Sequence, residues 1–331
     1  MTKNIEKRKN LKYAKRIVVK VGSKVLVDKS GKPNVQRMKK IVKDISSINK
    51  SIVYCSISAF GQDGPFKNRS AYDHVVQAMS GIMTTTGTKE SGPTKVGAAY
   101  VDYSTGLNAA FAILAALHQV KQTKKSVRID VSMLDTSLLL MANMVTEHLN
   151  NGWIPTQMGN EAQSGSPSSG MFKTKTSPIL LAANNDNQFS SLSDALNIID
   201  KFDKKKWSSE TYRKKNQKKL LQEFQRRFIK KTAEELEILL NKFNVPAGRV
   251  RTLPETVSEE QFIKRELWSN VEISSIGKNF KLPSIGFKVN ENAISPNNPP
   301  PVLGINTNDI LEELGYSNDQ IEELRKENVI N

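Results

Sequence analysis

The chain has 331 residues, 38% of them hydrophobic and 25% charged, with one cysteine and three histidines. These proportions are ordinary for a globular protein, and a single cysteine excludes an internal disulfide. The net charge of +16 lies mostly in residues 1–50, which carry 16 Lys and Arg against 3 Asp and Glu, whereas the other 281 residues carry 33 against 30. A nucleic-acid-binding domain would concentrate its charge on a folded face, so this distribution argues against a nucleic-acid partner.

Membrane insertion and secretion are also disfavoured. No stretch approaches the roughly 18 consecutive apolar residues that a membrane span needs, and the most apolar stretch, residues 97–117, is interrupted by Asp102 and other polar side chains. The lysine-rich N-terminus lacks the apolar core of a signal peptide. We therefore expect a cytoplasmic protein that contacts no membrane. The histidines and Cys55 show no metal-ligand spacing, so we expect no metal site.

The N-terminal segment has the pattern of one strand followed by one helix. Residues 16–28 begin with a β-branched run typical of a buried strand, and residues 34–48 carry apolar side chains at helical spacing. With the KVGS segment at residues 20–23, the pattern resembles the start of glutamate 5-kinase, of the amino-acid kinase family. The resemblance implies the phosphate end of a nucleotide site, where a lysine and open backbone amides suit phosphate oxygens. It covers only about 45 residues and lacks the later nucleotide-binding half, so we expect no kinase activity.

Further along the chain, apolar runs and helical spacing predict the following elements. Strands are expected over residues 51–58, 128–133 and 179–183. Helices are expected over residues 72–85, 97–118 and 134–149, with solvated helices in 201–242 and a final pair in 309–327. Residues 153–175 are rich in Gly, Ser and Pro, and we expect a mobile loop or a domain connection there.

Several collinear strings in this part of the chain carry a family resemblance. They are SISAFGQDGPFKNRSAYDHVVQAMSG at 56–81, KVGAAYVDYSTGLNAAFAILAAL at 95–117, RIDVSMLDTSLLLMAN at 128–143, NNDNQF at 184–189, NVPAGRV at 244–250 and PPPVLGINTNDILEELGYS at 299–317. The strings resemble the family III CoA-transferases, the CaiB–BaiF group that includes formyl-CoA transferase. The resemblance covers about residues 50–331.

The resemblance implies a reaction and its residues. Asp102 occupies the position of the carboxylate that attacks the acyl-CoA thioester, so that CoA passes to a carboxylic acid through an aspartyl intermediate. Coenzyme A is then a substrate, and no other cofactor is expected. The family's interlocked homodimers imply a second copy as partner. The resemblance places substrate-binding residues at Tyr72, Asp73, Gly165, Ser169 and Gly170.

Two alternatives concern the roles of Asp102 and Tyr72. Without the family, Asp102 is an acid near the start of a helical stretch, where an N-cap is common. At the positions that match Tyr72 and Asp73 of this chain, acyl-CoA racemases of the same superfamily carry a histidine followed by an aspartate. A phenol is a poorer base than imidazole at neutral pH, so Tyr72 favours the transferase over the racemase.

The fold class implied is α/β, an incomplete Rossmann-like large domain with a smaller α+β domain. We expect a kinase-like segment over residues 1–49, the large domain with the catalytic aspartate over 50–180, a small domain over 181–290, and a C-terminal segment over 291–331 that returns to the large domain. The family's N-terminal portion has no counterpart in the sequence, so we expect a gene fusion. The alternative function is a non-catalytic remnant that lacks a complete CoA site.

Overall fold

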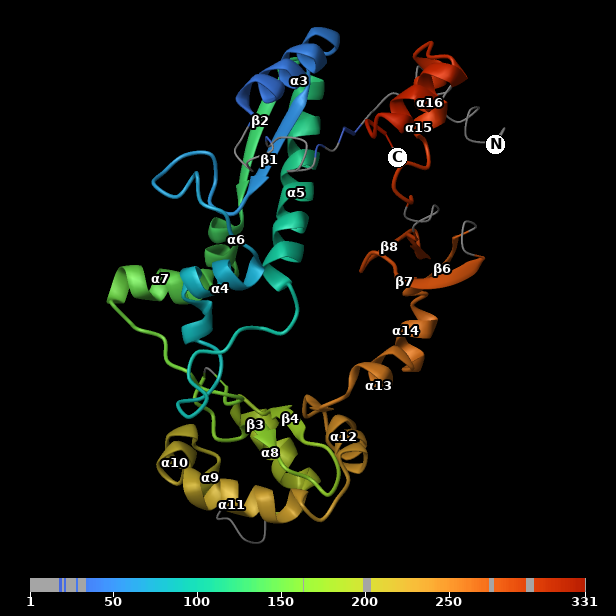
Figure 1. Ribbon diagram of the computed structural model, residues 1–331. Coiled ribbons are helices and arrows are strands. Elements are labelled where there is room, and N and C mark those ends of the chain that lie inside the picture. Colours follow the sequence, from blue (N-terminus) through green and yellow to red (C-terminus); the bar gives the residue numbers. More distant parts are fainter. Residues whose placement is uncertain are drawn as a thin grey trace. The chain divides into compact units, whose positions relative to one another are not determined.

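The computed structural model describes residues 18–19, 21, 28, 34–162, 164–198, 204–273, 277–295 and 301–330 (Figure 1). By its contacts the described chain forms two compact units, one within residues 23–250 and one around residues 251–330. This division differs from the expected domain limits, which stay a prediction. The strand expected over residues 16–28 and the KVGS segment lie mostly outside the described residues.

A parallel pair of strands organises the first part of the unit within residues 23–250. After α3 (Val35–Ile48), strand β1 (Val53–Ser58) runs parallel to β2 (Val127–Ser132) along its whole length. Parallel neighbours need a long crossover, and here it contains α4 (Asp73–Ser80), the short 3-10 helix η2 (Ile82–Thr84) and α5 (Tyr100–Thr123). Helix α5 lies along both strands (Figure 1). This arrangement confirms the expected α/β class.

The segment after β2 folds back onto the crossover helices. The sequence predicted one helix over residues 134–149, whereas the structure has two, α6 (Met133–Leu140) and α7 (Ala142–Asn151). The Ser132 hydroxyl accepts a hydrogen bond from the Asp135 amide and caps α6. Helix α6 begins directly after the carboxyl end of β2 and packs against α4 and α5. In Figure 1 the start of α5 lies beyond the carboxyl ends of the two strands.

The second part of this unit is an antiparallel sheet covered by helices. Its strands are β3 (Ser169–Phe172), β4 (Ile179–Ala182) and β5 (Ala247–Arg249), in the order β3-β4-β5. Its helices are α8 (Asp186–Ala195), α9 (Lys204–Trp207), α10 (Glu210–Lys215), α11 (Gln217–Phe228) and α12 (Ala233–Lys242). The prediction of a loop over residues 153–175 was wrong in extent, because Ser169–Phe172 form strand β3 and pair with β4. Backbone pairing outweighs the local composition there.

The core of this second part is apolar and continuous. Phe172 of β3 packs edge-on against Phe224 and Phe228 of α11, with ring centroids 6.0 and 5.1 Å apart. Helix α12 contributes Leu236 and Leu240, four residues apart and therefore on one face. Within the lysine- and glutamate-rich stretch expected to be solvated, helices α11 and α12 thus each bury one apolar stripe in this core.

The unit around residues 251–330 consists of short elements. They are α13 (Leu253–Val257), α14 (Glu260–Lys264), the hairpin of β6 (Trp268–Ile273) and β7 (Lys278–Pro283), the small pair β8 (Lys288–Val289) and β9 (Asn292–Ala293), α15 (Thr307–Glu313) and α16 (Asn318–Lys326). The final helix pair expected over residues 309–327 is confirmed. Throughout the described chain, no helix combines the length and apolar character needed to cross a membrane.

Two positions of α12 offer a matched test of the core. Leu236 is 0% exposed and Ile238, two residues later, is 65% exposed. We expect Leu236→Ala to lower the free energy of unfolding by about 2–5 kcal/mol, because it leaves a cavity among the buried phenylalanines. Ile238→Ala should change it by less than about 0.5 kcal/mol. Urea unfolding followed by circular dichroism measures both, and equal losses would contradict this packing.

Candidate functional site

Asp102 lies in the first turn of α5, and its side chain is exposed. The N-cap of α5 is Ala99, which offers no side-chain acceptor. The alternative reading of Asp102 as an N-cap is therefore wrong. In the part of the chain that the structure describes, no hydrogen bond involves the Asp102 carboxylate, and the residue is exposed, so its side chain is accessible to a reactant.

The carboxylate of Asp73 takes the place of the missing N-cap. Its Oδ2 accepts hydrogen bonds from the backbone amides of Val101 at 2.8 Å and Asp102 at 3.2 Å. The first N–H groups of a helix lack partners within the helix, and a negative group is favourable at that end. Asp73 is itself the first residue of α4 and is only 8% exposed. The start of one helix thereby holds the start of the other.

Two further residues complete the surroundings of Asp73. Its Oδ1 accepts a hydrogen bond from Gln77 Nε2, and Gln77 Oε1 accepts one from the Val96 amide at 2.9 Å. Burial, and secondly the negative charge of Asp73, raises the pKa of the Tyr100 phenol. The segment that leads into α5 is therefore fixed by polar contacts from α4.

Tyr72 precedes this cluster and behaves differently. It is the N-cap residue of α4, is 78% exposed, and its ring stacks on that of His74 at 6.2 Å between centroids. Because Tyr72 adjoins Asp73, which contacts the backbone of Asp102, the structure brings three of the residues predicted from the sequence together. Of these three residues, Tyr72 and Asp102 have exposed side chains that a ligand could reach, whereas Asp73 is buried.

The other three predicted residues lie on the segment that leads into β3. Gly165 has φ +64°, and Gly170 has φ +147° with the Asn160 carbonyl 3.3 Å from where a Cβ would sit, so both positions favour glycine. Ser169 is buried in β3, and its hydroxyl has no hydrogen-bond partner in the described residues. No hydrogen bond within residues 34–162 and 164–198 joins this segment to Asp102. Their substrate-binding role stays a prediction.

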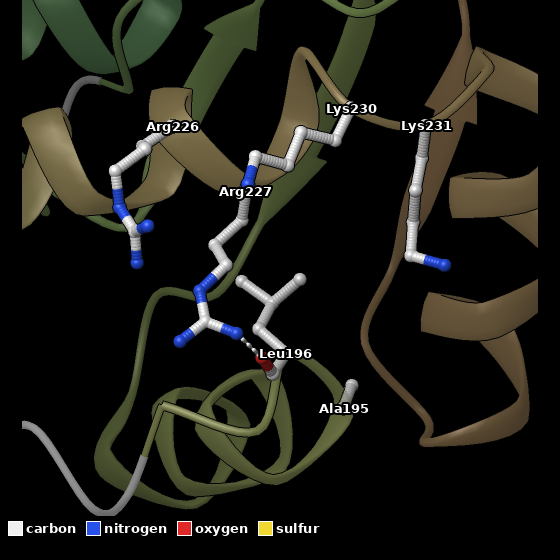
Figure 2. Close-up of a pocket in the computed structure, with 6 residues that line it drawn as sticks. All are labelled: Ala195, Leu196, Arg226, Arg227, Lys230 and Lys231. Carbon is white, nitrogen blue, oxygen red and sulfur yellow. Dashed lines mark hydrogen bonds between the residues drawn. The ribbon is translucent and has the colours of Figure 1, made fainter.

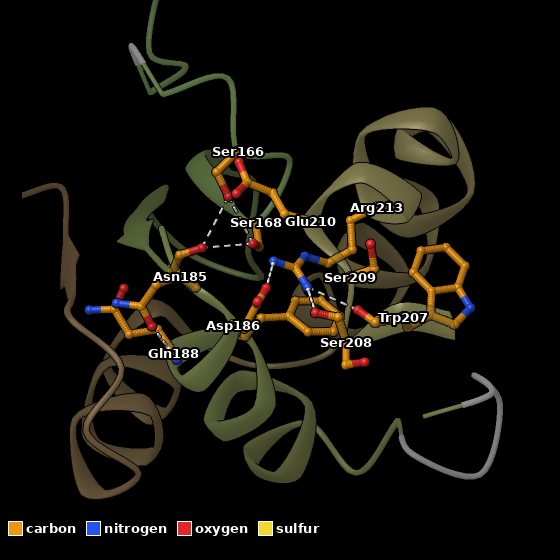
Figure 3. Close-up of polar contacts among 12 residues, drawn as sticks. Ser166, Ser168, Asn185, Asp186, Gln188, Trp207, Ser208, Ser209, Glu210 and Arg213 are labelled. Carbon is orange, nitrogen blue, oxygen red and sulfur yellow. Dashed lines mark hydrogen bonds and ion pairs between the residues drawn. The ribbon is translucent and has the colours of Figure 1, made fainter. Parts of the chain in front are cut away.

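Buried polar contacts that the sequence did not predict support this segment (Figure 3). The hydroxyls of Ser166 and Ser168 both donate to the Ala183 carbonyl, at 3.1 and 2.8 Å. Nearby, the fully buried Arg213 bonds Asp186 at 2.6 Å. Its guanidinium also donates to two backbone carbonyls of residues 207 and 208 and lies 4.4 Å from the centre of the Phe189 ring. Arg213 lies in a stretch that was expected to be solvated, so the sequence did not single it out. Its partner Asp186 does lie in one of the family strings, NNDNQF at 184–189.

A cavity of about 390 Å³ lies elsewhere in the same unit (Figure 2). Its lining is basic and consists of Ala195, Leu196, Arg226, Arg227, Lys230 and Lys231. Arg226 and Arg227 both bind Glu223, and Arg227 also donates to the Leu196 carbonyl at the end of α8. Basic side chains at a helix C-terminus are favourable without any ligand. None of the residues predicted for the site lines this cavity.

A metal centre has no visible basis among the residues that the structure describes, because no group of three or more His, Cys, Asp or Glu side chains gathers there. The expectation of no metal site stays a prediction.

A model of one protein family, described as CoA-transferase family III, matches residues 2–307 of this chain. The chain belongs to CoA-transferase family III. Succinyl-CoA:glutarate CoA-transferase of Mus musculus is 31% identical over 288 residues, which are 87% of this chain and 66% of that protein. Succinate--glutarate CoA-transferase of Agrobacterium fabrum is 29% identical over 81% of this chain and 66% of its own length. This family III member therefore spans slightly less than two thirds of these relatives.

Solved structures agree with this family assignment. The crystal structure of a CAIB/BAIF family protein from Brucella suis matches with a TM-score of 0.70 and 28% identity, over 82% of this chain and 70% of that one. The expected CoA-transferase fold is thus confirmed. The family match begins at residue 2 and so includes the segment that resembles glutamate 5-kinase. The kinase resemblance, the gene fusion and the cytoplasmic location stay predictions.

The environment of Tyr100 predicts a titration. Because its pKa is raised above the ordinary tyrosine value of about 10, the phenol stabilises the fold below that pH, and this contribution is lost as pH rises through the folded-state pKa. We expect the absorbance change at 295 nm that disappears in Tyr100→Phe to have a midpoint above about 10. Asp73→Asn should lower that midpoint only in part, since burial is the larger cause. A midpoint at or below 10 would contradict the packing around Asp73.

Proposed function

We propose that this family III member transfers CoA between an acyl-CoA thioester and a carboxylic acid, with Asp102 as the nucleophile. The observation that carries the proposal is the exposed carboxylate of Asp102 in the first turn of α5, fixed through its own backbone amide by Asp73. Family membership supports the same activity. A carboxylate is the nucleophile that this exchange needs, because the acyl group must pass through a mixed anhydride.

The proposed reaction proceeds in four balanced steps. An oxygen of Asp102 attacks the thioester carbonyl carbon and the C–S bond breaks. The products are the CoA thiolate and a mixed anhydride between Asp102 and the acyl group. The thiolate attacks the aspartyl carbon, which releases the donor's carboxylate and leaves an aspartyl-CoA thioester. The acceptor carboxylate attacks that thioester and again expels the thiolate, and attack of the thiolate on the acceptor's acyl carbon frees Asp102.

The environment needed for these steps suggests roles for other residues. Each acyl transfer passes through an oxyanion that requires hydrogen-bond donors. The segment with Gly165 that leads into β3 is proposed to cover the anhydride and exclude water, in keeping with the resemblance, while Ser169 and Gly170, which pair in β3, hold the end of that segment. Tyr72 is proposed to contact the substrate, since its ring is exposed beside the start of α5. Coenzyme A acts here as substrate, with no metal or redox cofactor.

The relatives suggest which substrates to try. Two of them are named for succinyl-CoA or succinate with glutarate, and one from Acetobacter aceti for acetyl-CoA with oxalate. Their common acceptor chemistry is a small dicarboxylate. We therefore propose succinyl-CoA as donor and a short dicarboxylic acid as acceptor for this chain.

The covalent step can be tested directly. The purified chain is incubated with succinyl-CoA, treated with hydroxylamine and digested, and a hydroxamate on the peptide containing Asp102 is expected by mass spectrometry. Asp102→Asn should abolish it. Asp135→Asn is the matched control, because Asp135 occupies the corresponding position in the first turn of α6 and is exposed as well. Absence of any adduct, with failure to retain CoA, would favour the non-catalytic alternative.

We also propose a homodimer, supported by an apolar stripe on α5. Tyr103, Leu107, Phe111 and Leu114 lie at helical spacing on one face, and each is more than half exposed. A contiguous apolar face of this kind is unusual for a surface that meets only water.

The stripe predicts the effect of added charge on assembly. Sedimentation analysis of the unaltered chain should give a dimer, and Phe111→Glu should shift it towards monomer, because a carboxylate would be buried at the interface. Ile238→Glu, on an exposed position of α12, should leave the assembly unchanged. A monomer at micromolar concentration, or equal behaviour of both variants, would contradict the proposal.

A further inference from the structure

The buried face of α4 is unusually polar. Its buried residues are Asp73, Val76, Gln77 and Ser80, at the spacing of one helical face, and three of the four carry polar side chains. Each polar group has a partner on a different segment. Asp73 bonds the amides that open α5, Gln77 bonds the amide of Val96, and Ser80 accepts a hydrogen bond from Ser137 of α6 at 2.8 Å. Such a face specifies geometry, because a buried polar group is costly unless each partner is in place.

We infer that Asp73 is a positioning residue, which sets the orientation of Asp102 through the backbone of the first turn of α5. This inference rests on the proposed function, and it gives Asp73 a role different from substrate contact. Both of its carboxylate oxygens already bind groups of this chain. With 8% exposure, little of its surface is open to a ligand.

The consequence for Asp102 follows from helix geometry. In the first turn of α5, Ala99 supplies no side-chain cap, and the amides of Val101 and Asp102 depend on Asp73. Charge-assisted hydrogen bonds of this kind are short and directional. Fixing the Asp102 amide fixes its Cα and hence the direction in which its side chain leaves the helix. A nucleophile displaced by about 1 Å can lose about 100-fold in rate.

The pairing of Asp73 with Gln77 suggests a test in which donors and acceptors are exchanged. In Asp73→Asn the new amide nitrogen faces the Gln77 amide nitrogen, so one hydrogen bond becomes a clash of two donors. Adding Gln77→Glu restores an acceptor opposite that nitrogen and keeps an acceptor for the Val96 amide. The double variant therefore keeps the contacts and the net charge, with the charge moved to residue 77.

Three full-length proteins are compared, namely the unaltered chain, Asp73→Asn and the double variant, by adduct formation and by hydrogen exchange. We expect Asp73→Asn to slow formation of the Asp102 succinyl adduct by roughly 10- to 100-fold, with CoA affinity unchanged within about twofold, and the double variant to recover most of the rate. Hydrogen exchange at the amides of Val101 and Asp102 should quicken in the single variant and recover in the double variant.

Several outcomes would overturn the inference. Asp73→Asn could react at the unaltered rate, or CoA affinity could fall in proportion to the rate, which would make Asp73 a substrate contact. The double variant could also stay slow although amide protection returns. If the unaltered chain forms no adduct, the proposed function fails. Hydrogen exchange at the amides of Val101 and Asp102 then decides by itself whether Asp73 holds the first turn of α5. Unchanged exchange in Asp73→Asn would reject that role.

Discussion

The hydrogen bonds from the first turn of α5 to the Asp73 carboxylate are the contact on which the candidate site depends. A helix of 24 residues presents unpaired N–H groups at its start, and here the capping residue Ala99 has no side chain able to accept them. A buried acid on a neighbouring helix meets this need. The same contact places the backbone of Asp102, so the stability of the helix start and the geometry of the site have one cause.

The parallel pair of β1 and β2 explains why these helices meet. A parallel crossover requires a long connection, and residues 59–126 supply it with α4 and α5. Helix α5 begins on the side of the strands' carboxyl ends, and α6 begins directly after β2. Ligand sites of open α/β sheets usually lie at that edge. The location of Asp102 agrees with this general rule.

Buried polar groups also organise the second part of the same unit. Arg213 satisfies Asp186 and two backbone carbonyls at once while its guanidinium lies over Phe189. The planar fork of arginine allows this set of contacts, and lysine could not reproduce it. Beside it, the serine hydroxyls that anchor the start of β3 share the carbonyl of Ala183. In both parts, buried polar groups fix orientation, and in the second part the phenylalanines and leucines supply the apolar core.

The sequence by itself determined the family, the α/β class, the strands at β1, β2 and β4, and the final helix pair, because local apolar patterns and collinear motifs carry these features. It also marked Asp102. Only the tertiary structure decided that Asp73 is buried against α5, that Arg213 is fully buried, and that Ser169 belongs to a strand. These outcomes depend on partners 13 to 29 residues away, Ala182 for Ser169, Asp186 for Arg213 and Val101 and Asp102 for Asp73, and no local pattern contains such partners.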